Sequence, residues 1–405
     1  MHNTATLGNG LRIIHETATT ANVYCGIIIK AGTADEDDKD LGLAHFCEHT
    51  TFKGTARRQA HHIRTYLDGC GADLNAYTAK EETCYYTAVP AAQFRRAVDL
   101  LTDIVFHSTY PQRELDKEKK VIADEIDSYL DSPAELIYDE FERIIFEGHP
   151  LGRDILGTVE RLEQYTTDDA LRFARQYYQP ANATFYVLGN LPFGRITRIL
   201  ERATRDLQST ATTPRSSLLA PLTPTTITQH HDTHQAHVLI GNRSYPRGHS
   251  LNPALTLCNS LLGGSGMNTL LGVALREHRG LVYTVYSSVY TYTPAGIWTI
   301  YYGCDEQNIN RCHKLIMNQL DRLCNQPIGR RKLQAAKQLL CSQLLLSQDH
   351  LGSHALAMGK RYAFTNQHRD INTIIEQLQA VTPEQTLRAA QEVFNPAQLT
   401  TLVYK

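Results

Sequence analysis

The chain has 405 residues, of which 42% are hydrophobic and 20% charged, and its formal net charge is −2. This length exceeds what one hydrophobic core usually serves, so two domains are expected. The near-neutral charge gives no reason to expect nucleic acid or an anionic membrane as a partner.

Targeting features are not evident in the sequence. No apolar run is long enough to span a bilayer, and the first ten residues lack the basic and apolar regions of a signal peptide. The cysteines form no C-x-x-C pair, which is typical of reduced thiols in a cytosolic protein. A cytoplasmic location is therefore expected. The nine cysteines are Cys25, Cys47, Cys70, Cys84, Cys258, Cys304, Cys312, Cys324 and Cys341.

The first half of the chain begins and ends with strand-like segments. Runs rich in β-branched residues occupy 11–15 and 23–29, and a predicted hairpin pairs 73–78 with 83–89. Helical patterns then dominate from residue 93 to about 179. Strands with helices between them indicate an α+β fold, in which a mainly antiparallel sheet is backed by helices.

The most informative stretch is His45-Phe46-Cys47-Glu48-His49, with two imidazoles and one carboxylate in the order H-x-x-E-H. Residues four apart share a helix face, so His45 and His49 can reach one metal ion. Glu48 stands at the edge of that face, where it can accept a proton from water without being a ligand. This order is typical of zinc peptidases with the inverted motif.

A solvent-exposed helix that carries two histidines and a glutamate is the alternative interpretation. The catalytic interpretation needs a third protein ligand, because catalytic zinc usually has three and one open position. The helix-like segment 112–130 places Glu118 and Glu125 seven residues apart on one face. Spacing alone does not choose between them, and each could also belong to a solvated helix face.

An internal repeat divides the chain. Segment 171–187 recurs as 387–403 at a constant offset of 216 residues (387 − 171 and 403 − 187), each copy reading as helix, proline turn and strand. Residues 209–224 are rich in Ser, Thr and Pro, which is typical of an extended linker. The sequence predicts two homologous domains, one at 1–208 that carries the H-x-x-E-H motif and a second at 225–405.

The second copy lacks the metal motif. The repeat offset moves the motif residues onto Leu261, Gly264 and Ser265, so one metal site per chain is expected. The glycine-rich segment 263–267 is not a phosphate-binding loop, because no lysine follows it, and no ATP dependence is expected. A denser histidine cluster at 230–237 has no helical register, which leaves a second metal site there as a weaker alternative.

The motif and the residues Thr51-Phe-Lys-Gly-Thr55 that follow it resemble the M16 metallopeptidase family, which includes pitrilysin, insulin-degrading and mitochondrial processing peptidases. In that family a glutamate ligand follows the second histidine by the separation that joins His49 to Glu125 (125 − 49 = 76). An auxiliary glutamate precedes that ligand by seven residues, which is the position of Glu118. The resemblance implies that His45, His49 and Glu125 bind one Zn²⁺ per chain.

Further segments extend the resemblance over most of the chain. Residues 151–158 and the glycine-rich segment look like family segments, and Arg276 and Tyr283 match an arginine–tyrosine pair seven apart. This pair is implied to grip the substrate backbone and stabilise the oxyanion. Without the resemblance, Arg276 reads as an exposed arginine and Tyr283 as a core tyrosine.

The resemblance also implies roles in the first half. Glu48 would be the general base, Glu118 would support the site, and Asn75-Ala76-Tyr77 would form an edge strand that pairs with bound peptide. Cys47, at a variable position of the motif, would place an oxidation-sensitive thiol near the metal.

A peptidase acting on peptides or unstructured polypeptides in an enclosed chamber is the function that the resemblance implies, with each chain forming half of a clamshell. The doubled members of the family carry zinc in the first of four domains and the Arg/Tyr pair in the last. One chain of this length holds both half-sites, so we expect a homodimer in which Arg276 and Tyr283 complete the partner subunit's site. A catalytically silent scaffold or a peptide-binding subunit of the same fold is the alternative.

Overall fold

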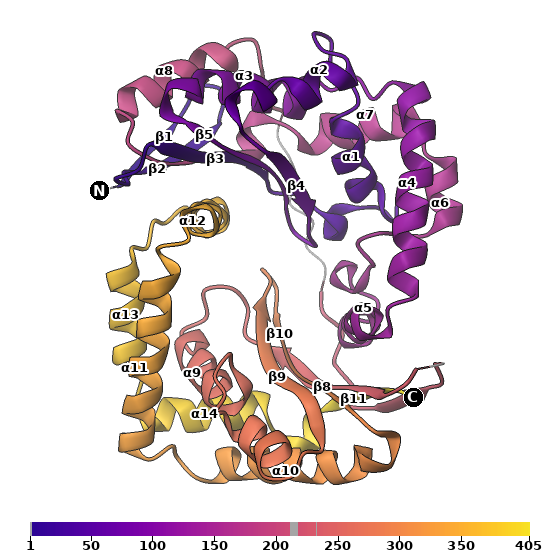
Figure 1. Ribbon diagram of the computed structural model, residues 1–405, viewed down its shortest axis with the longest axis vertical. Helices are drawn as coiled ribbons and strands as arrows, with labels where there is room; N and C mark the ends of the chain where they lie inside the picture. Colours follow the sequence, from indigo (N-terminus) through magenta and orange to yellow (C-terminus); the bar gives the residue numbers. More distant parts are fainter. Residues whose placement is uncertain (1, 211–217, 232) are drawn as a thin grey trace. The chain divides into compact units, whose positions relative to one another are not determined.

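The computed structural model describes residues 2–210, 218–231 and 233–405. The chain forms two compact units: the first comprises Met1–Ser128, Arg153–Ser217 and Ser347–His368, and the second Tyr129–Gly152, Leu218–Leu346 and Arg369–Lys405. Each unit contains one β-sheet with its own helices (Figure 1). The expected α+β fold with two sheets is confirmed.

The sheet of the first unit has six strands in the order β1-β2-β6-β3-β5-β4. All neighbours are antiparallel except β2 and β6, and the predicted hairpin is β4 with β5, where Thr78 pairs with Thr83. The most buried strands, β3 and β6, are rich in β-branched and aromatic residues, as suits a central position. The strands are β1 (His2–Thr6), β2 (Arg12–Glu16), β3 (Asn22–Ile29), β4 (Leu74–Thr78), β5 (Thr83–Pro90) and β6 (Ala183–Leu188).

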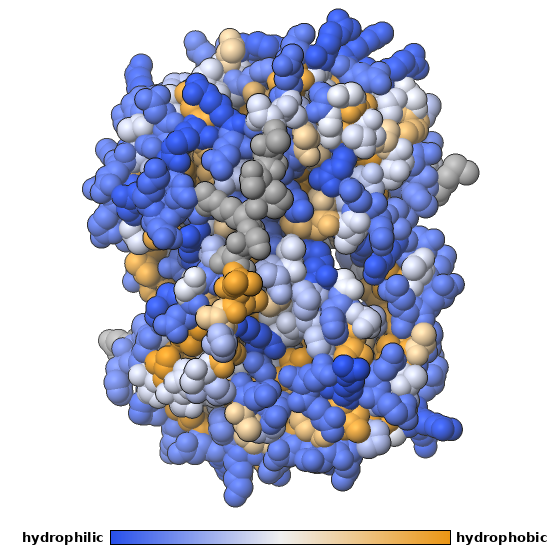
Figure 2. All heavy atoms as spheres, turned by 180° about the vertical axis from the view of Figure 1, so that it is seen from behind, coloured by the Kyte–Doolittle hydropathy of each residue, from blue (hydrophilic) through white to orange (hydrophobic). Residues whose placement is uncertain are grey.

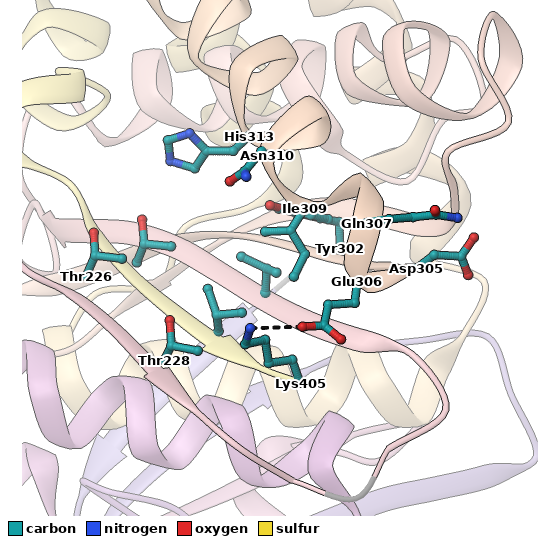
Figure 3. Close-up of a pocket in the computed structure, with 13 residues that line it drawn as sticks. Thr226, Thr228, Tyr302, Asp305, Glu306, Gln307, Ile309, Asn310, His313 and Lys405 are labelled. Atoms are coloured by element: carbon teal, nitrogen blue, oxygen red, sulfur yellow. Dashed lines mark hydrogen bonds and ion pairs between the residues drawn. The ribbon is translucent and has the colours of Figure 1, made fainter.

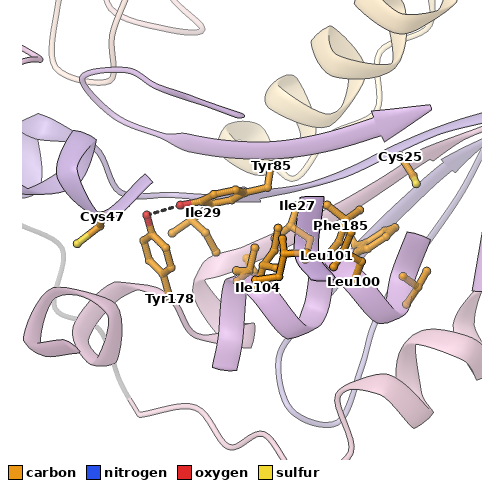
Figure 4. Close-up of a cluster of buried hydrophobic side chains, with 14 of the residues drawn as sticks. Cys25, Ile27, Ile29, Cys47, Tyr85, Leu100, Leu101, Ile104, Tyr178 and Phe185 are labelled. Carbon is orange, nitrogen blue, oxygen red and sulfur yellow. Dashed lines mark hydrogen bonds between the residues drawn. The ribbon is translucent and has the colours of Figure 1, made fainter. Parts of the chain in front are cut away.

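Helices cover both faces of this sheet. One face packs on the larger core, part of which Figure 4 shows, where Tyr85, Tyr178 and Phe185 meet aliphatic side chains of helix α3. The other face is covered by α12, whose Gly359 would hold a Cβ only 2.5 Å from the ring of Tyr186, so only glycine allows this close packing. The helices are α1 (Leu43–Thr51), α2 (Ala60–Thr65), α3 (Phe94–His107), α4 (Gln112–Leu130), α6 (Val159–Gln164), α7 (Thr167–Tyr177), α8 (Phe193–Ala203) and α12 (Leu351–Thr365).

The sheet of the second unit has five strands in the order β7-β11-β8-β10-β9, with only β7 and β11 parallel. Its core lies between one sheet face and helices α9, α10 and α14, while α5 packs on β8 and β11. The strands are β7 (Thr226–Gln229), β8 (Ala236–Ser244), β9 (Val282–Thr291), β10 (Gly296–Cys304) and β11 (Thr400–Tyr404). The helices are α5 (Pro133–Ile145), α9 (Asn252–Gly263), α10 (Ile309–Asn325), α11 (Arg330–Ser347), α13 (Ile371–Gln379), α14 (Pro383–Val393) and a π-helix at Gly272–Glu277.

The predicted repeat is confirmed as structure. In the first copy α7 leads through a 3-10 turn at Pro180–Asn182 into β6, and in the second α14 leads through Pro396–Gln398 into β11. Both helices begin with a capping box, from Thr166 and from Thr382, whose side chains satisfy free N–H groups of the first turn. The same local signals therefore build the same helix–turn–strand unit twice.

Two helices belong to the unit that is formed mainly by the other half of the sequence. Helix α5, from the first half, belongs to the second unit, and α12, from the second half, belongs to the first. The expected domains 1–208 and 225–405 are continuous in sequence, whereas the compact units are not. Residues 211–217 of the expected linker lie outside the described residues, and the described part of 209–224 contains no helix or strand.

Polar residues predominate on the face of the molecule shown in Figure 2, and apolar residues lie there in small separate groups. Among the described residues, none of the helices combines the length and the apolar character needed to cross a bilayer. All nine cysteines are free thiols, and most of them are buried.

Candidate functional site

Helices α1 and α4 bring three potential metal ligands of the first unit together. The Nε2 atoms of His45 and His49 lie 3.8 and 3.3 Å from Oε2 of Glu125. One donor atom from each of the three residues lies within 4.8 Å of the others, and no other such group of His, Cys, Asp or Glu was found in the described part of the chain. The two histidines come from adjacent turns of α1, and the carboxylate comes from the C-terminal half of α4.

The spacing of these donor atoms fits a tetrahedral zinc ion. Zinc bonds of about 2.0–2.2 Å to nitrogen and oxygen place tetrahedral donors roughly 3.4 Å apart, close to both measured separations. The set of two imidazoles and one carboxylate also suits zinc and leaves room for a fourth, exchangeable position. The Glu125 side chain is 45% exposed, so solvent reaches the ligand set from the side of α4.

Burial and neighbouring carboxylates shift the pKa values of the two histidines in opposite directions. It lowers the pKa of His45 to about 3, with a further contribution from the charge of His49, so His45 stays neutral and keeps a lone pair for a metal. Burial alone would lower the pKa of His49 as well. The hydrogen bond to Glu118 and the charges of Glu48 and Glu125 outweigh burial, so the pKa of His49 is raised in the metal-free protein.

Glu48 is a buried carboxylate beside the ligand set and is not part of it. Burial raises its pKa to about 7, opposed by the charge of His49 and assisted by that of Glu125. A carboxyl group with a pKa near neutrality can both accept and return a proton at physiological pH. This is the proton-transfer chemistry that the sequence motif predicts for Glu48.

Glu118 lies two turns before Glu125 on α4 and holds His49 in place. Its Oε1 is 3.1 Å from Nδ1 of His49, and its Oε2 is 2.5 Å from Nζ of Lys53. Burial would raise the pKa of Glu118, but these two partners outweigh it and lower the pKa, so the carboxylate stays ionised. Histidine ligands are commonly oriented by such a carboxylate. Sequence reasoning missed Lys53, although it follows His49 by one helical turn.

The N-terminus of α1 is fixed by a residue that the sequence did not reveal. The buried carboxylate of Glu36 accepts hydrogen bonds from the N–H groups of Gly42 (3.0 Å) and Ala44 (2.7 Å), while the N-cap position offers no side-chain cap. Burial raises the pKa of Glu36 well above its usual value, and the two backbone hydrogen bonds at the positive end of the helix oppose that rise. Gly42 has a φ of 83°, and a Cβ there would lie 2.6 Å from the carbonyl oxygen of Leu156. Capping patterns span three residues, so a glutamate six residues upstream escapes them.

Buried hydroxyl groups fix the other end of α1. Oγ1 of Thr51 lies 3.2 Å from the hydroxyl of Tyr85 and 3.3 Å from that of Tyr110, and the hydroxyl of Tyr178 is 2.9 Å from that of Tyr85 (Figure 4). Each hydroxyl can donate one hydrogen bond and accept others, so the network satisfies groups that would be costly to bury alone. The helix that carries the histidines is thereby anchored at both ends.

The expectation of an oxidation-sensitive thiol at Cys47 is wrong. Its side chain is fully buried in the core behind α1, and its Sγ lies 3.9 Å from the carbonyl oxygen of Ala170. Burial raises the pKa of this thiol well above its usual value, which disfavours the reactive thiolate. Position 47 falls on the core face of α1, opposite to the face that the two histidines share.

Asn75, Ala76 and Tyr77 lie in β4, which is the edge strand of the first sheet and packs beside α1. Asn75 is exposed, and the other two are partly buried. An edge strand has one row of backbone groups that no sheet neighbour uses, which is the requirement for adding a peptide strand.

Arg276 and Tyr283 belong to the second unit. Arg276 lies in the π-helix and pairs with Glu277 at 2.9 Å, and Tyr283 lies in the edge strand β9 with 90% of its surface exposed. The interpretation of Tyr283 as a core tyrosine is therefore wrong, and its phenol is available to a ligand. Leu261, Gly264 and Ser265, which occupy the repeat-related positions at the end of α9, provide no histidine or carboxylate.

The histidine cluster at 230–237 is dispersed in the structure, apart from residue 232, which lies outside the described residues. The ring of His231 stacks on Tyr404, and Nδ1 of His237 is 2.7 Å from the hydroxyl of Tyr301. The described residues of this segment form no metal-ligand group. These histidines serve as packing and hydrogen-bonding residues at the ends of β7 and β8.

A pocket of about 850 Å³ lies in the second unit between the sheet and the start of α10 (Figure 3). Glu306 and Lys405 form an ion pair of 2.9 Å at its side, and His313 lies on α10 across the pocket. The lining offers no set of metal ligands and no nucleophile paired with a base. The hydrolytic chemistry that the sequence predicts is thus supported by the first unit and not by this pocket.

Comparison with known proteins gives matches along most of the chain. The insulinase family (peptidase family M16) matches residues 12–159, and the peptidase M16 inactive domain matches residues 164–340. The chain is 33% identical over 392 residues to the uncharacterized zinc protease YmxG of Bacillus subtilis, covering 96% of this chain and 95% of that protein. An uncharacterized zinc protease of Streptomyces coelicolor is 29% identical over 397 residues, covering 96% of this chain and 86% of that protein.

Solved structures share the fold along the whole chain. A protease from Helicobacter pylori superimposes with a TM-score of 0.90 at 21% identity, covering 100% of this chain and 99% of that one. A crystal structure described as a peptidase M16 inactive domain from Pseudomonas fluorescens also gives 0.90, at 20% identity, covering 100% and 97%. At these identities the likeness establishes the fold alone.

Proposed function

The chain belongs to the insulinase family of peptidases, M16, and on that premise we propose that it is a zinc-dependent endopeptidase acting on peptides and unstructured polypeptides. The convergence of His45, His49 and Glu125 on one point carries this proposal. An inactive scaffold does not need three metal-ligand side chains at zinc spacing or a buried glutamate beside them. The presence of all four side chains therefore favours an active enzyme.

The proposed mechanism divides the work among the residues around this point. Zinc, when bound, acts as a Lewis acid that polarises the scissile carbonyl and makes water a nucleophile near neutral pH. Glu48 takes the proton of the attacking water and delivers it to the leaving amine. Glu48 is buried beside the three ligand residues, which places its carboxyl group where both transfers occur. Glu118, braced by Lys53, keeps the ring of His49 oriented.

Substrate binding is proposed to use the free edge of β4. An extended peptide that adds to this edge would be held by backbone hydrogen bonds at Asn75, Ala76 and Tyr77. Backbone recognition requires an unfolded segment and tolerates many side chains. Cleavage of varied unstructured peptides, with folded proteins resistant, is the specificity that this arrangement favours.

The finer part of the proposal is a cytoplasmic homodimer that cleaves its substrate in an enclosed chamber. Arg276 and Tyr283 of one subunit would complete the zinc site of the partner by holding the substrate backbone and the developing oxyanion. The exposure of the Tyr283 phenol supports a role in contacting a ligand. The free state of all nine cysteines supports a reducing compartment.

Peptide hydrolysis by the purified, zinc-loaded protein tests the activity. We expect cleavage of an unstructured peptide that a zinc chelator stops and that Glu48→Gln lowers by about 10² to 10⁴-fold without loss of zinc. Glu163→Gln, at an exposed carboxylate of α6, is the matched control and should keep full activity. If the protein holds zinc but cleaves none of a broad set of unstructured peptides, the silent-scaffold alternative is correct.

Mixing two inactive variants tests the shared site. Glu48→Gln lacks the base and Arg276→Ala lacks the substrate grip, so a mixed dimer would contain one complete site. We expect the mixture, after subunit exchange, to regain a fraction of the activity. A mixture that forms mixed dimers and stays inactive contradicts the cross-subunit proposal and leaves the peptidase proposal standing.

A further inference from the structure

A strongly basic pocket of about 770 Å³ lies in the first unit, where α3 and α8 pack together on the same side of the sheet (Figure 1). It contains none of the metal-ligand residues. Its lining includes five arginines, which come from the turn after α1, from α3 and from α8: Arg57, Arg95, Arg195, Arg198 and Arg202.

The arginines of α8 follow one stripe of the helix. Arg195, Arg198 and Arg202 are three and four residues apart, so their side chains share a face, while Ile196 and Leu200 bury the opposite side in the core. Like charges at this spacing destabilise a helix. Within the described residues, no ion pair joins these arginines to an acidic group. The repulsion among these three arginines destabilises the helix, and folding gives no reason for it. Local features that lower stability in this way are common at functional sites.

The acidic residues of the pocket do not neutralise this charge. Asp99 is already engaged by Arg57 at 2.9 Å, by Tyr66 at 2.8 Å and by Arg58. Five arginines and two aspartates line the pocket, which leaves an excess of three positive charges (5 − 2) in a chain whose overall net charge is −2. The side chains of Arg95, Arg195 and Arg202 have no hydrogen-bond or ion-pair partner among the residues that the structure describes. Their guanidinium groups are available to an anion.

The floor of the pocket is apolar. Val98 of α3 and Ile199 and Ala203 of α8 are buried or half-buried side chains that line it below the arginines. Guanidinium groups bind phosphate oxygens through paired hydrogen bonds, and an apolar floor offers a surface for the organic part of a ligand. The pocket volume lies in the range of small-molecule sites, about 300–1,000 Å³.

We propose that this pocket binds a small organic polyphosphate, such as a nucleoside triphosphate, with the phosphates on the arginines and the organic body on the apolar floor. The proposal does not depend on the peptidase activity. It concerns binding without hydrolysis, because the lining contains neither a phosphate-binding loop nor a lysine. The shared chemistry is the phosphate chain, so both free tripolyphosphate and a nucleotide should bind, the nucleotide more tightly.

Isothermal titration of the full-length, zinc-loaded protein with ATP, tripolyphosphate and adenosine tests this proposal. We expect ATP and tripolyphosphate to bind with dissociation constants on the order of 10–100 μM at low salt and more weakly at high salt, and adenosine alone not to bind measurably. Arg195→Gln combined with Arg202→Gln should weaken binding at least about tenfold, because two charge-assisted contacts are lost. Both positions are exposed, so the fold should be retained, and a melting curve checks this.

Two controls make the outcome decisive. Arg331→Gln removes an exposed arginine of α11 in the second unit and should bind like the wild type. Phosphates chelate zinc, but the double variant keeps the zinc ligands, so heat from metal capture would be unchanged in it. Equal binding by the double variant and the control, or no binding by the wild type, overturns the proposal. Equal binding of an acidic polypeptide of matched charge overturns the assignment to phosphate.

Discussion

The two units have the same helix, proline turn and central strand, yet only the first gathers metal ligands within the described residues. Tyr178 and Phe394 occupy the same place in the repeat, one at the end of a hydrogen-bonded hydroxyl network and the other packed on Trp298. The scaffold therefore tolerates either a polar or an apolar interior beside that turn. Folding and the gathering of potential metal ligands are thus specified by different residues on one framework.

The largest effect is expected from removing a metal ligand, because only the first unit is proposed to bind zinc. His45→Ala removes one of three donors, so zinc content should fall from about one per chain to nearly none, and peptide cleavage should disappear. Leu261→Ala, at the repeat-related position of the second unit, should keep both zinc and cleavage. Elemental analysis and a peptide assay measure the two quantities. Retention of a full zinc equivalent by His45→Ala would show that the ligand set is different.

A smaller effect is expected from the residue that orients a ligand. Glu118→Gln leaves all three donors in place but weakens the hold on His49, which should lower zinc affinity or activity by about 10 to 100-fold. Competition with a chelator measures the affinity. Glu114→Gln, at a half-buried position of the same helix where the carboxylate pairs with Lys117, should bind zinc like the wild type. Equal affinities for the two variants would reduce Glu118 to a packing residue.

Exchanging the repeat-related aromatic residues tests whether the interiors are interchangeable. Tyr178→Phe removes one hydrogen bond and should cost about 0.5–1.5 kcal/mol, whereas Phe394→Tyr buries a hydroxyl beside Trp298 and should cost about 1–3 kcal/mol. Native-state hydrogen exchange of the β6 and β11 amides reports each unit separately. Equal costs would mean that the hydroxyl network contributes nothing specific to the first unit.

The smallest effect concerns the attachment of α12 to the first sheet. Glu16 of β2 lies 2.9 Å from Nε2 of His354 and 3.4 Å from Nε2 of His368, and its pKa is lowered, chiefly by the hydrogen bond with His354. A lowered carboxyl pKa stabilises the fold fully above about pH 4.5 and ceases to do so as pH falls through the folded-state value.

The melting temperature of the wild type should thus fall more than that of Glu16→Gln between pH 5 and 3. The difference corresponds to about 1 kcal/mol or less in the free energy of unfolding. Glu201→Gln, at an exposed position of α8, should follow the wild type. Parallel pH profiles for all three proteins would exclude this pairing as a source of stability.

The sequence predicted the parts of the site that lie on single helices. His45, Glu48 and His49 lie on adjacent turns of one helix, and Glu125 follows from the family spacing, so local periodicity and the resemblance predicted that these residues lie together. The hairpin of β4 and β5 and the helix–turn–strand repeat were also predicted, because caps, prolines and alternation are local signals.

Features that depend on tertiary contacts were not predicted. The amphipathic pattern of α5 or α12 shows which face is buried but not which sheet it will cover. Glu36 reaches α1 across a turn, and the arginine pocket joins α3 to α8, about a hundred residues apart in sequence. Cys47 lies two residues from each histidine, so helical spacing already places it on the opposite face of α1, but its complete burial depends on the core that packs behind that face.

Helix α12 comes late in the sequence but packs on the first sheet, which delays completion of the first unit during synthesis. Apolar side chains on one face of the first sheet, among them Ile14, Ile28 and Tyr186, are covered by Ala355, Met358 and Tyr362 of α12. A ribosome must therefore translate almost the whole chain before that face can be buried. Until then the nascent first half exposes an apolar sheet face. We therefore expect chaperones to bind it during synthesis.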